Sequence, residues 1–141
     1  MSNHVDVTEA EKKALVKMMK AKATKSGSTV YGGAGPGSDV DYIMTKGMLF
    51  KVIGKKRYEE LVDQEDSNYD DGEFEGKFYY DGITYDMIVV DTLMKYKAWR
   101  AATHEMKRLS SCGFDFSDKQ ERVHIFAFLV RAHVRNAEGV R

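Results

Sequence analysis

The 141-residue sequence has one cysteine, one proline and no long hydrophobic run. A single cysteine, Cys112, cannot form a disulfide within the chain, which excludes a disulfide-stapled domain and fits a reducing compartment. The longest apolar run, IFAFLV at residues 125–130, is too short to cross a bilayer. The opening MSNHVDVTEAEKK lacks the apolar core of a signal peptide. We therefore expect a cytoplasmic protein without a membrane partner, in which Cys112 is a packing residue.

The composition is that of a compact globular protein, with 43% hydrophobic residues. We expect one domain over residues 1–141. The net charge of zero is unevenly distributed. Residues 1–58 carry 11 Lys and Arg against 5 Asp and Glu, residues 59–91 carry 1 against 12, and residues 92–141 carry 10 against 5. This division permits a basic surface for a polyanionic partner without requiring one.

Capping signals mark the expected helices. Thr8 and Glu11 form a capping box before a helix at residues 9–25, and a short helix capped by Thr45 stops near Gly54. Two further helices are expected at residues 92–109 and 117–137, the second opening with a capping box of Ser117 and Gln120. The acidic stretch at residues 59–76 fails the spacing of an EF-hand loop and is interpreted as a solvated connection.

Strands are expected between these helices. STVY at residues 28–31 reads as a short strand ending at Gly32 and Gly33, and DVDYIM at residues 39–44 as a second. Two β-rich runs flank Asp81-Gly82, a dipeptide typical of a tight hairpin turn, and the later run is expected inside the sheet because it is more apolar. The sequence thus predicts an α+β fold: a small mixed sheet with an antiparallel hairpin, flanked by an N-terminal helix and two C-terminal helices.

Three aspartates indicate a metal site. Successive strand side chains alternate, so Asp39 and Asp41 project from one face. Their mutual repulsion is relieved by a divalent cation, and Mg²⁺ prefers carboxylate oxygen. Asp86 is the expected third ligand, because it interrupts the apolar strand ITYDMIVV, where a lone charge is costly.

Residues 28–91 resemble the DNA polymerase β-like nucleotidyltransferase superfamily: a Gly-Gly pair, a glycine-rich loop, Ser-Asp-x-Asp and a later strand Asp. The resemblance implies that Asp39, Asp41 and Asp86 bind two Mg²⁺ ions, with Mn²⁺ as a possible substitute. It also implies phosphate contacts from Gly32, Gly33 and Ser38. The family usually has a longer segment with a helical turn between the glycine pair and the first Asp. Gly27-Ser28 restores that spacing, but Gly32-Gly33 is preferred because STVY supplies the preceding strand.

The C-terminal part is similar to small nucleotidyltransferase-like proteins of tailed phages. The similarity lies in Trp99, Ala102, Thr103, Lys119 and Arg122. Lys119 and Arg122 lie three apart on one helical face, either as a cationic pair for a triphosphate or as two solvated charges.

Other conspicuous side chains of the C-terminal helices are read as structural. His124 and His133 have no partner at metal spacing. Trp99 and Phe126 are interpreted as core residues.

The leading hypothesis is a Mg²⁺-dependent nucleotidyltransferase that transfers a nucleotidyl group from an NTP to an unknown hydroxyl on RNA, a protein or a small molecule. Asp86 is also the expected general base. The alternative is a catalytically silent protein of the same fold that acts as a nucleotide-binding, inhibitory or regulatory partner. A third possibility is a purely structural acidic cluster.

Overall fold

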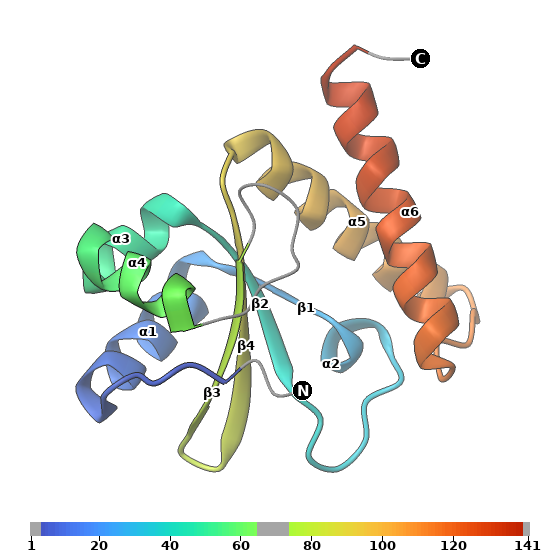
Figure 1. The fold of residues 1–141 in the computed structure, drawn as a ribbon. Helices are drawn as coiled ribbons and strands as arrows, with labels where there is room; N and C mark the ends of the chain where they lie inside the picture. Colours follow the sequence, from blue (N-terminus) through green and yellow to red (C-terminus); the bar gives the residue numbers. More distant parts are fainter. Residues whose placement is uncertain (1–3, 65–73, 140–141) are drawn as a thin grey trace.

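The computed structural model describes residues 4–64 and 74–139, which form six helices around a four-stranded sheet (Figure 1). The helices are α1 (Glu9–Lys22), α2 (Ser28–Tyr31), α3 (Lys46–Ile53), α4 (Lys55–Gln64), α5 (Leu93–Ser111) and α6 (Lys119–Ala137). The strands are β1 (Thr24–Ser26), β2 (Val40–Thr45), β3 (Phe74–Tyr80) and β4 (Ile83–Val90). The expected α+β class is confirmed. No helix within these residues is both long enough and apolar enough to span a bilayer.

The sheet has the strand order β1-β2-β4-β3 and is mixed. β2 and β4 are parallel, whereas β1 pairs antiparallel with β2 and β3 antiparallel with β4. The predicted hairpin is confirmed: β3 and β4 are joined at Asp81 (φ 49°) and Gly82 (φ 82°), and positive φ at both central residues is the requirement of a tight hairpin turn. The more apolar strand, β4, lies inside the sheet as expected.

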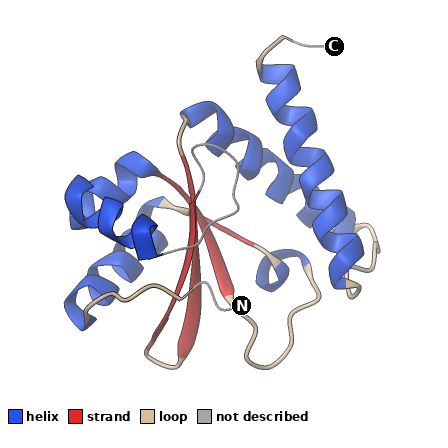
Figure 2. Ribbon diagram, viewed as in Figure 1, coloured by secondary structure: helices blue, strands red, loops and turns tan. Residues whose placement is uncertain are grey.

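Helices cover both faces of the sheet (Figure 2). α1 and α3 pack on one face, with α4 beside α3, whereas α2 and α5 pack on the other, with α6 against α5. Side-chain alternation along β2 divides the residues accordingly, so that Tyr42 and Met44 face the first layer while Asp41 and Ile43 face the second. The predicted carboxylates therefore lie on the α5 side of the sheet.

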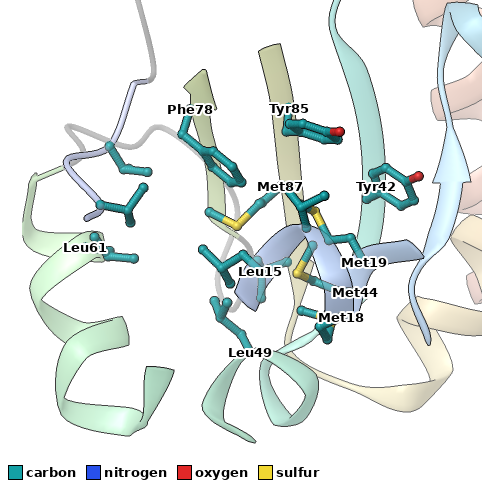
Figure 3. Packing of buried hydrophobic residues seen from close by; sticks show 14 of the residues in the cluster. Leu15, Met18, Met19, Tyr42, Met44, Leu49, Leu61, Phe78, Tyr85 and Met87 are labelled. Carbon is teal, nitrogen blue, oxygen red and sulfur yellow. The ribbon is translucent and has the colours of Figure 1, made fainter. Parts of the chain in front are cut away.

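The main hydrophobic core lies between the sheet and α1, α3 and α4 (Figure 3). Leu15, Met19, Met44, Leu49 and Met87 have no exposed surface there. Burying a side chain of this size contributes about 1.5–3 kcal/mol of hydrophobic stabilisation. This core covers one face of the sheet, and the opposite face carries both the aspartates and a smaller apolar cluster that includes Ile43 and Val90.

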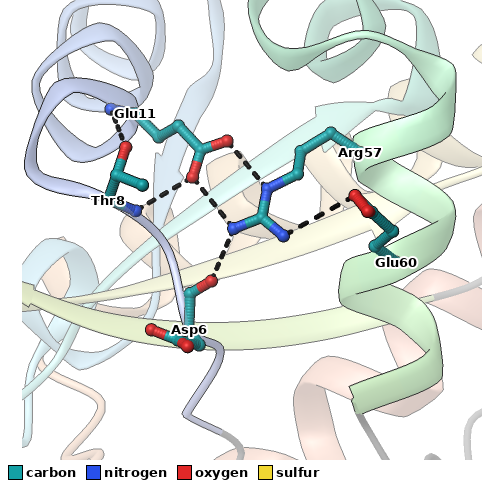
Figure 4. A network of polar contacts seen from close by, with 5 residues as sticks. All are labelled: Asp6, Thr8, Glu11, Arg57 and Glu60. Atoms are coloured by element: carbon teal, nitrogen blue, oxygen red, sulfur yellow. Dashed lines mark hydrogen bonds and ion pairs between the residues drawn. The ribbon is translucent and has the colours of Figure 1, made fainter.

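A polar network joins the start of α1 to α4 (Figure 4). The predicted capping box is confirmed, because the Thr8 hydroxyl accepts from the Glu11 amide and the Glu11 carboxylate accepts from the Thr8 amide. Arg57 donates to both oxygens of the same carboxylate, at 2.8 and 3.0 Å, and to the Asp6 carbonyl at 2.7 Å. A third guanidinium nitrogen lies 3.9 Å from Glu60. Bidentate pairing of this kind fixes the angle between two elements more firmly than a single contact does.

Two predictions near the N-terminus were wrong. The helix expected at residues 9–25 ends at Lys22, because residues 24–26 pair with β2 as strand β1. STVY, expected as a strand, is the short helix α2. Its Tyr31 is buried against Met106 and Phe116, so tertiary packing overrides the β preference of Val and Tyr.

The acidic segment at residues 59–76 was also interpreted too simply. Residues 59–64 belong to α4, where Leu61 is fully buried, and residues 74–76 begin β3. The rest of the expected connection, residues 65–73, lies outside the described residues. Tyr58 and Leu61 are three apart on the buried side of α4, which is the helical signal that the high charge of this stretch obscured.

Two smaller corrections concern the C-terminal helices. α6 is capped by Asp118, whose carboxylate accepts from the Glu121 amide at 3.1 Å, and not by Ser117. The Ser117 amide instead donates to the Asp115 carboxylate. Cys112 is exposed at the end of α5 and is not a packing residue.

Candidate active site

The register of β2 and β4 brings two of the predicted aspartates side by side. Asp41 and Asp86 are direct Cα partners in this parallel pair. Asp39 lies one residue before β2, and its charge acts on Asp41. Parallel neighbours in register project from the same face of a sheet. The expectation that the three aspartates share one face is met.

Two further charged residues, which the sequence reasoning missed, enter the same site from β3. Lys77 is the Cα partner of Asp86, and its ammonium lies 2.8 Å from the Asp39 carboxylate. Glu75 shares a hydrogen bond with Asp86. Alternation along β3 supplies the missing signal, because Phe74 and Phe78 fill the core, so Glu75 and Lys77 must face the other way.

Asp86 is the most deeply placed carboxyl group of the site, with 4% of its surface exposed. Burial raises its pKa to about 10, and the hydrogen bond to Glu75 and the charges of Glu75 and Asp41 act in the same direction. Within residues 4–64 and 74–139, its Oδ1 has no hydrogen-bond partner. A buried polar atom without a partner is costly, so this oxygen is a position that a ligand would stabilise.

Asp41 is also affected by burial and by neighbouring carboxyl groups. Burial raises its pKa to about 7, reinforced by the charges of Glu75 and Asp39, while Lys77 and Arg122 act in the opposite direction. Burial is the largest cause of both shifts, and the neighbouring carboxyl groups add a smaller contribution that a cation would offset.

These residues have the donor atoms that a divalent ion requires, but their side chains are not arranged around a common metal position. In residues 4–64 and 74–139, no three His, Cys, Asp or Glu side chains are arranged to hold a metal ion. Asp39 is paired with Lys77 and Asp86 with Glu75, so their oxygens do not point at a common centre. Carboxylate donors, mutual repulsion and the unpartnered Oδ1 of Asp86 nevertheless match what a hard cation requires.

A glycine lies directly against Asp41. Gly27 follows β1 with φ 79° and ψ −170° and precedes α2. A Cβ atom at this position would lie 2.1 Å from the Asp41 Oδ2, far inside contact distance. The site therefore needs glycine here for two reasons, its backbone conformation and the approach of the carboxylate.

The glycine pair preferred from the sequence has other surroundings. Gly32 and Gly33 follow a helix and not the expected strand, which removes the reason for preferring them. A Cβ on Gly33 would lie 2.2 Å from the Arg122 guanidinium and 2.6 Å from the Phe116 carbonyl. The space beside Gly33 is therefore filled by protein atoms and is not open to a phosphate group. Ser38 closes a turn by accepting from the Gly35 amide at 2.8 Å.

The two cations expected on α6 have different surroundings. Arg122 donates to the Phe116 carbonyl at 2.7 Å, and its charge acts on Asp41 and Tyr31. Lys119 is exposed in the first turn of the helix. The structure therefore brings Arg122 to the aspartate site and leaves Lys119 in solvent.

His133 pairs with Glu105 of α5, with 2.5 Å between Nε2 and Oε1. The sequence spacing did not predict this carboxylate partner. The pair joins α6 to α5, which agrees with a structural role.

A cavity of about 700 Å³ opens beside Asp41, between the sheet and α6. Gly27 and Asp41 line it on the sheet side, and Tyr31, Trp99 and Phe126 contribute aromatic walls. The Trp99 and Phe126 rings meet edge to face, with centroids 5.4 Å apart. Sequence reasoning assigned both rings to the core, whereas they are half-buried and border this space.

The same cavity has a basic side. Arg131 and Arg135 of α6 line it, as does Lys95 of α5, which pairs with Asp91 at 3.3 Å. A pocket of 300–1,000 Å³ with apolar walls and a few convergent polar groups is typical of a small-molecule site. This one combines acidic, aromatic and basic surfaces around one volume.

No family model matches this chain, and neither a curated protein nor a solved structure matches it. The functional proposal therefore rests on the residues and geometry described above.

Proposed function

We propose that this protein is a Mg²⁺-dependent nucleotidyltransferase that transfers a nucleotidyl group from an NTP to a hydroxyl acceptor, with the cytoplasm as its setting. One observation carries the proposal: the adjacent carboxylates Asp41 and Asp86 lie on a buried sheet face, and Asp41 borders a cavity large enough for a nucleotide. The resemblance of the Ser-Asp-x-Asp element to polymerase β-like nucleotidyltransferases supports the same reading.

Residues 28–31 form a helix and not the expected strand, and this supports the resemblance. Gly27-Ser28 follows strand β1, and the helical turn of α2 lies between this pair and Asp39. A strand, a Gly-Ser pair and a helical turn before the first Asp is the usual order in the family. We therefore propose Gly27 and Ser28, in place of Gly32 and Gly33, as the phosphate contacts.

Different walls of the cavity suit different parts of a nucleotide. Its aromatic walls, including Trp99 and Phe126, offer stacking surface for a base. Arg131 and Arg135 supply guanidinium groups, which recognise phosphate oxygens in bidentate fashion. Arg122, close to Asp41, is a further candidate for a phosphate contact.

The aspartates have separate tasks in this proposal. A bound divalent ion would supply Lewis-acid stabilisation of the reacting phosphate. Asp41 and Asp86 would hold it, with Asp39 as the third ligand. A bound cation would favour the ionised form of Asp86, whose pKa is otherwise raised to about 10, and the carboxylate would then accept the proton of the acceptor hydroxyl.

A specific observation favours the alternative, a catalytically silent protein that binds a nucleotide and acts as a regulatory partner. Asp39 forms an ion pair with Lys77, which a fully assembled three-carboxylate metal site would not contain. This alternative predicts nucleotide binding without turnover.

Calorimetric titration with each of the four NTPs, with and without Mg²⁺, tests the proposal. The wild type should bind one or more NTPs only when Mg²⁺ is present, and Asp41→Asn should abolish that binding. Asp81→Asn is the matched control, because Asp81 lies in the hairpin turn. Binding that is equal with and without Mg²⁺, and equal in Asp41→Asn, would contradict the proposal. Release of pyrophosphate then separates the enzyme from the silent alternative.

A further inference from the structure

The Lys77 ammonium lies within the acidic cluster formed by Asp39, Asp41, Glu75 and Asp86. It is 2.8 Å from Asp39, and it interacts electrostatically with Glu75, Asp86 and Asp41 as well. Lys77 and Asp39 are about 28% and 32% exposed, so the pair is partly shielded from water. The Lys77 ammonium therefore provides a positive charge within the cluster without any bound ion.

The acidic and basic groups of the cluster are unequal in number. Four carboxyl groups surround one ammonium, and Arg122 adds a second positive charge that acts on Asp41. The ammonium is hydrogen-bonded to Asp39, so it does not pair equally with all four carboxyl groups.

A second observation shows where a further cation would fit. Asp86 is 4% exposed and lies within the cluster, and its Oδ1 has no hydrogen-bond partner among the described residues. Its neighbour Asp41 is the Cα partner on β2 and borders the cavity. The cluster therefore has two parts, an Asp39 side paired directly with Lys77 and an Asp41–Asp86 side on which Lys77 and Arg122 act through their charges.

We propose that Lys77 is a built-in counter-ion that occupies the Asp39 side of the cluster, so that the protein alone binds one divalent ion, between Asp41 and Asp86, in place of two. This inference rests on the proposed function for the identity of the ion as a divalent metal. In the protein without nucleotide, the positive charge of Lys77 acts in two ways: it withholds Asp39, which would become the third ligand when an NTP is bound, and it repels a second ion.

Titration with Mn²⁺ alone, monitored by the paramagnetic signal of the free ion, tests the inference without any nucleotide. The wild type should bind one Mn²⁺ per chain. Lys77→Met removes the charge and should bind a second ion, or the first about tenfold more tightly. Lys77→Arg keeps the charge and should behave as the wild type. Lys25→Met is the matched control, because Lys25 is a strand lysine whose Cα partner, Tyr42, faces the opposite side of the sheet.

The outcomes separate this inference from the proposed function. One outcome is that the wild type binds one ion, that Asp86→Asn abolishes this binding, and that Lys77→Met changes neither stoichiometry nor affinity. The counter-ion role of Lys77 is then overturned, while the metal site is supported. If neither the wild type nor Lys77→Met binds Mn²⁺ at millimolar concentration, this inference is overturned, and the proposed function is decided separately by the titration with NTP and Mg²⁺. Circular dichroism of every variant confirms that the comparison is made between folded proteins.

Discussion

Replacement of Gly27 by alanine is the sharpest perturbation of the site that leaves all its charges in place. Gly27 has φ 79° and ψ −170°, a conformation essentially confined to glycine, which costs another residue about 1–3 kcal/mol. The added Cβ would also lie 2.1 Å from the Asp41 Oδ2, so the carboxylate has to move. We expect a total loss of about 2–4 kcal/mol in the free energy of unfolding, together with loss of the metal response.

Gly37→Ala is the matched control. Gly37 has φ 78°, almost the same value, but an added Cβ would meet no atom of the described residues within 4 Å. Its cost should be the backbone strain alone, about 1–2 kcal/mol. Urea unfolding gives the stability of each variant, and the change in melting temperature on adding Mg²⁺ and NTP gives the integrity of the site. The reasoning is refuted if Gly27→Ala retains the wild-type melting response, since the Asp41 carboxylate would then tolerate displacement.

Three predictions concern the scaffold. Leu61→Ala should lower the free energy of unfolding by about 2–5 kcal/mol in urea titration, because Leu61 is fully buried; a loss below 1 kcal/mol would remove α4 from the core. Asp118→Ala should cost about 1 kcal/mol and Ser117→Ala much less in the same assay, because Asp118 caps α6; the reverse order would restore the sequence prediction. The hydrogen bonds from Arg57 lower the Glu11 pKa below 4.5, so their stabilisation is complete above that pH and is lost as the pH falls through the folded-state pKa. Glu11→Gln should thus be less stable than the wild type by at most about 1 kcal/mol at pH 7 and equal to it in acid, and a pH-independent difference would contradict the ion pair.

Local signals in the sequence predicted much of this fold. The Asp81-Gly82 turn, the Thr8–Glu11 capping box and the Thr45 cap depend on neighbours within a few residues, and all three are confirmed. The interior position of β4 followed from its apolar composition. Asp39 and Asp41 lie close together as expected, although Asp39 precedes β2 and is held near the site by its ion pair with Lys77.

The errors arose where distant contacts decide the conformation. Residues 24–26 form a strand because β2 offers a partner, and α2 is helical because Tyr31 packs against residues of α5 and of the loop before α6. Neither partner is close in sequence. Lys77 and Glu75 reached the site through the register of β3 against β4, which no local pattern specifies.

The central claim is that Asp86 and its neighbours bind the metal that holds an NTP, and the change in melting temperature on adding Mg²⁺ and NTP tests it most directly. At a ligand concentration of about 100 times Kd, linkage contributes about 2.7 kcal/mol, or a shift of about 5–10 °C for a domain of this size. Asp86→Asn preserves the shape of the buried side chain and should abolish the shift, whereas a variant with Asp66, Asp70 and Asp71 changed to Asn, positions outside the described residues, should retain it. A shift that survives Asp86→Asn and disappears in the triple variant would contradict the account.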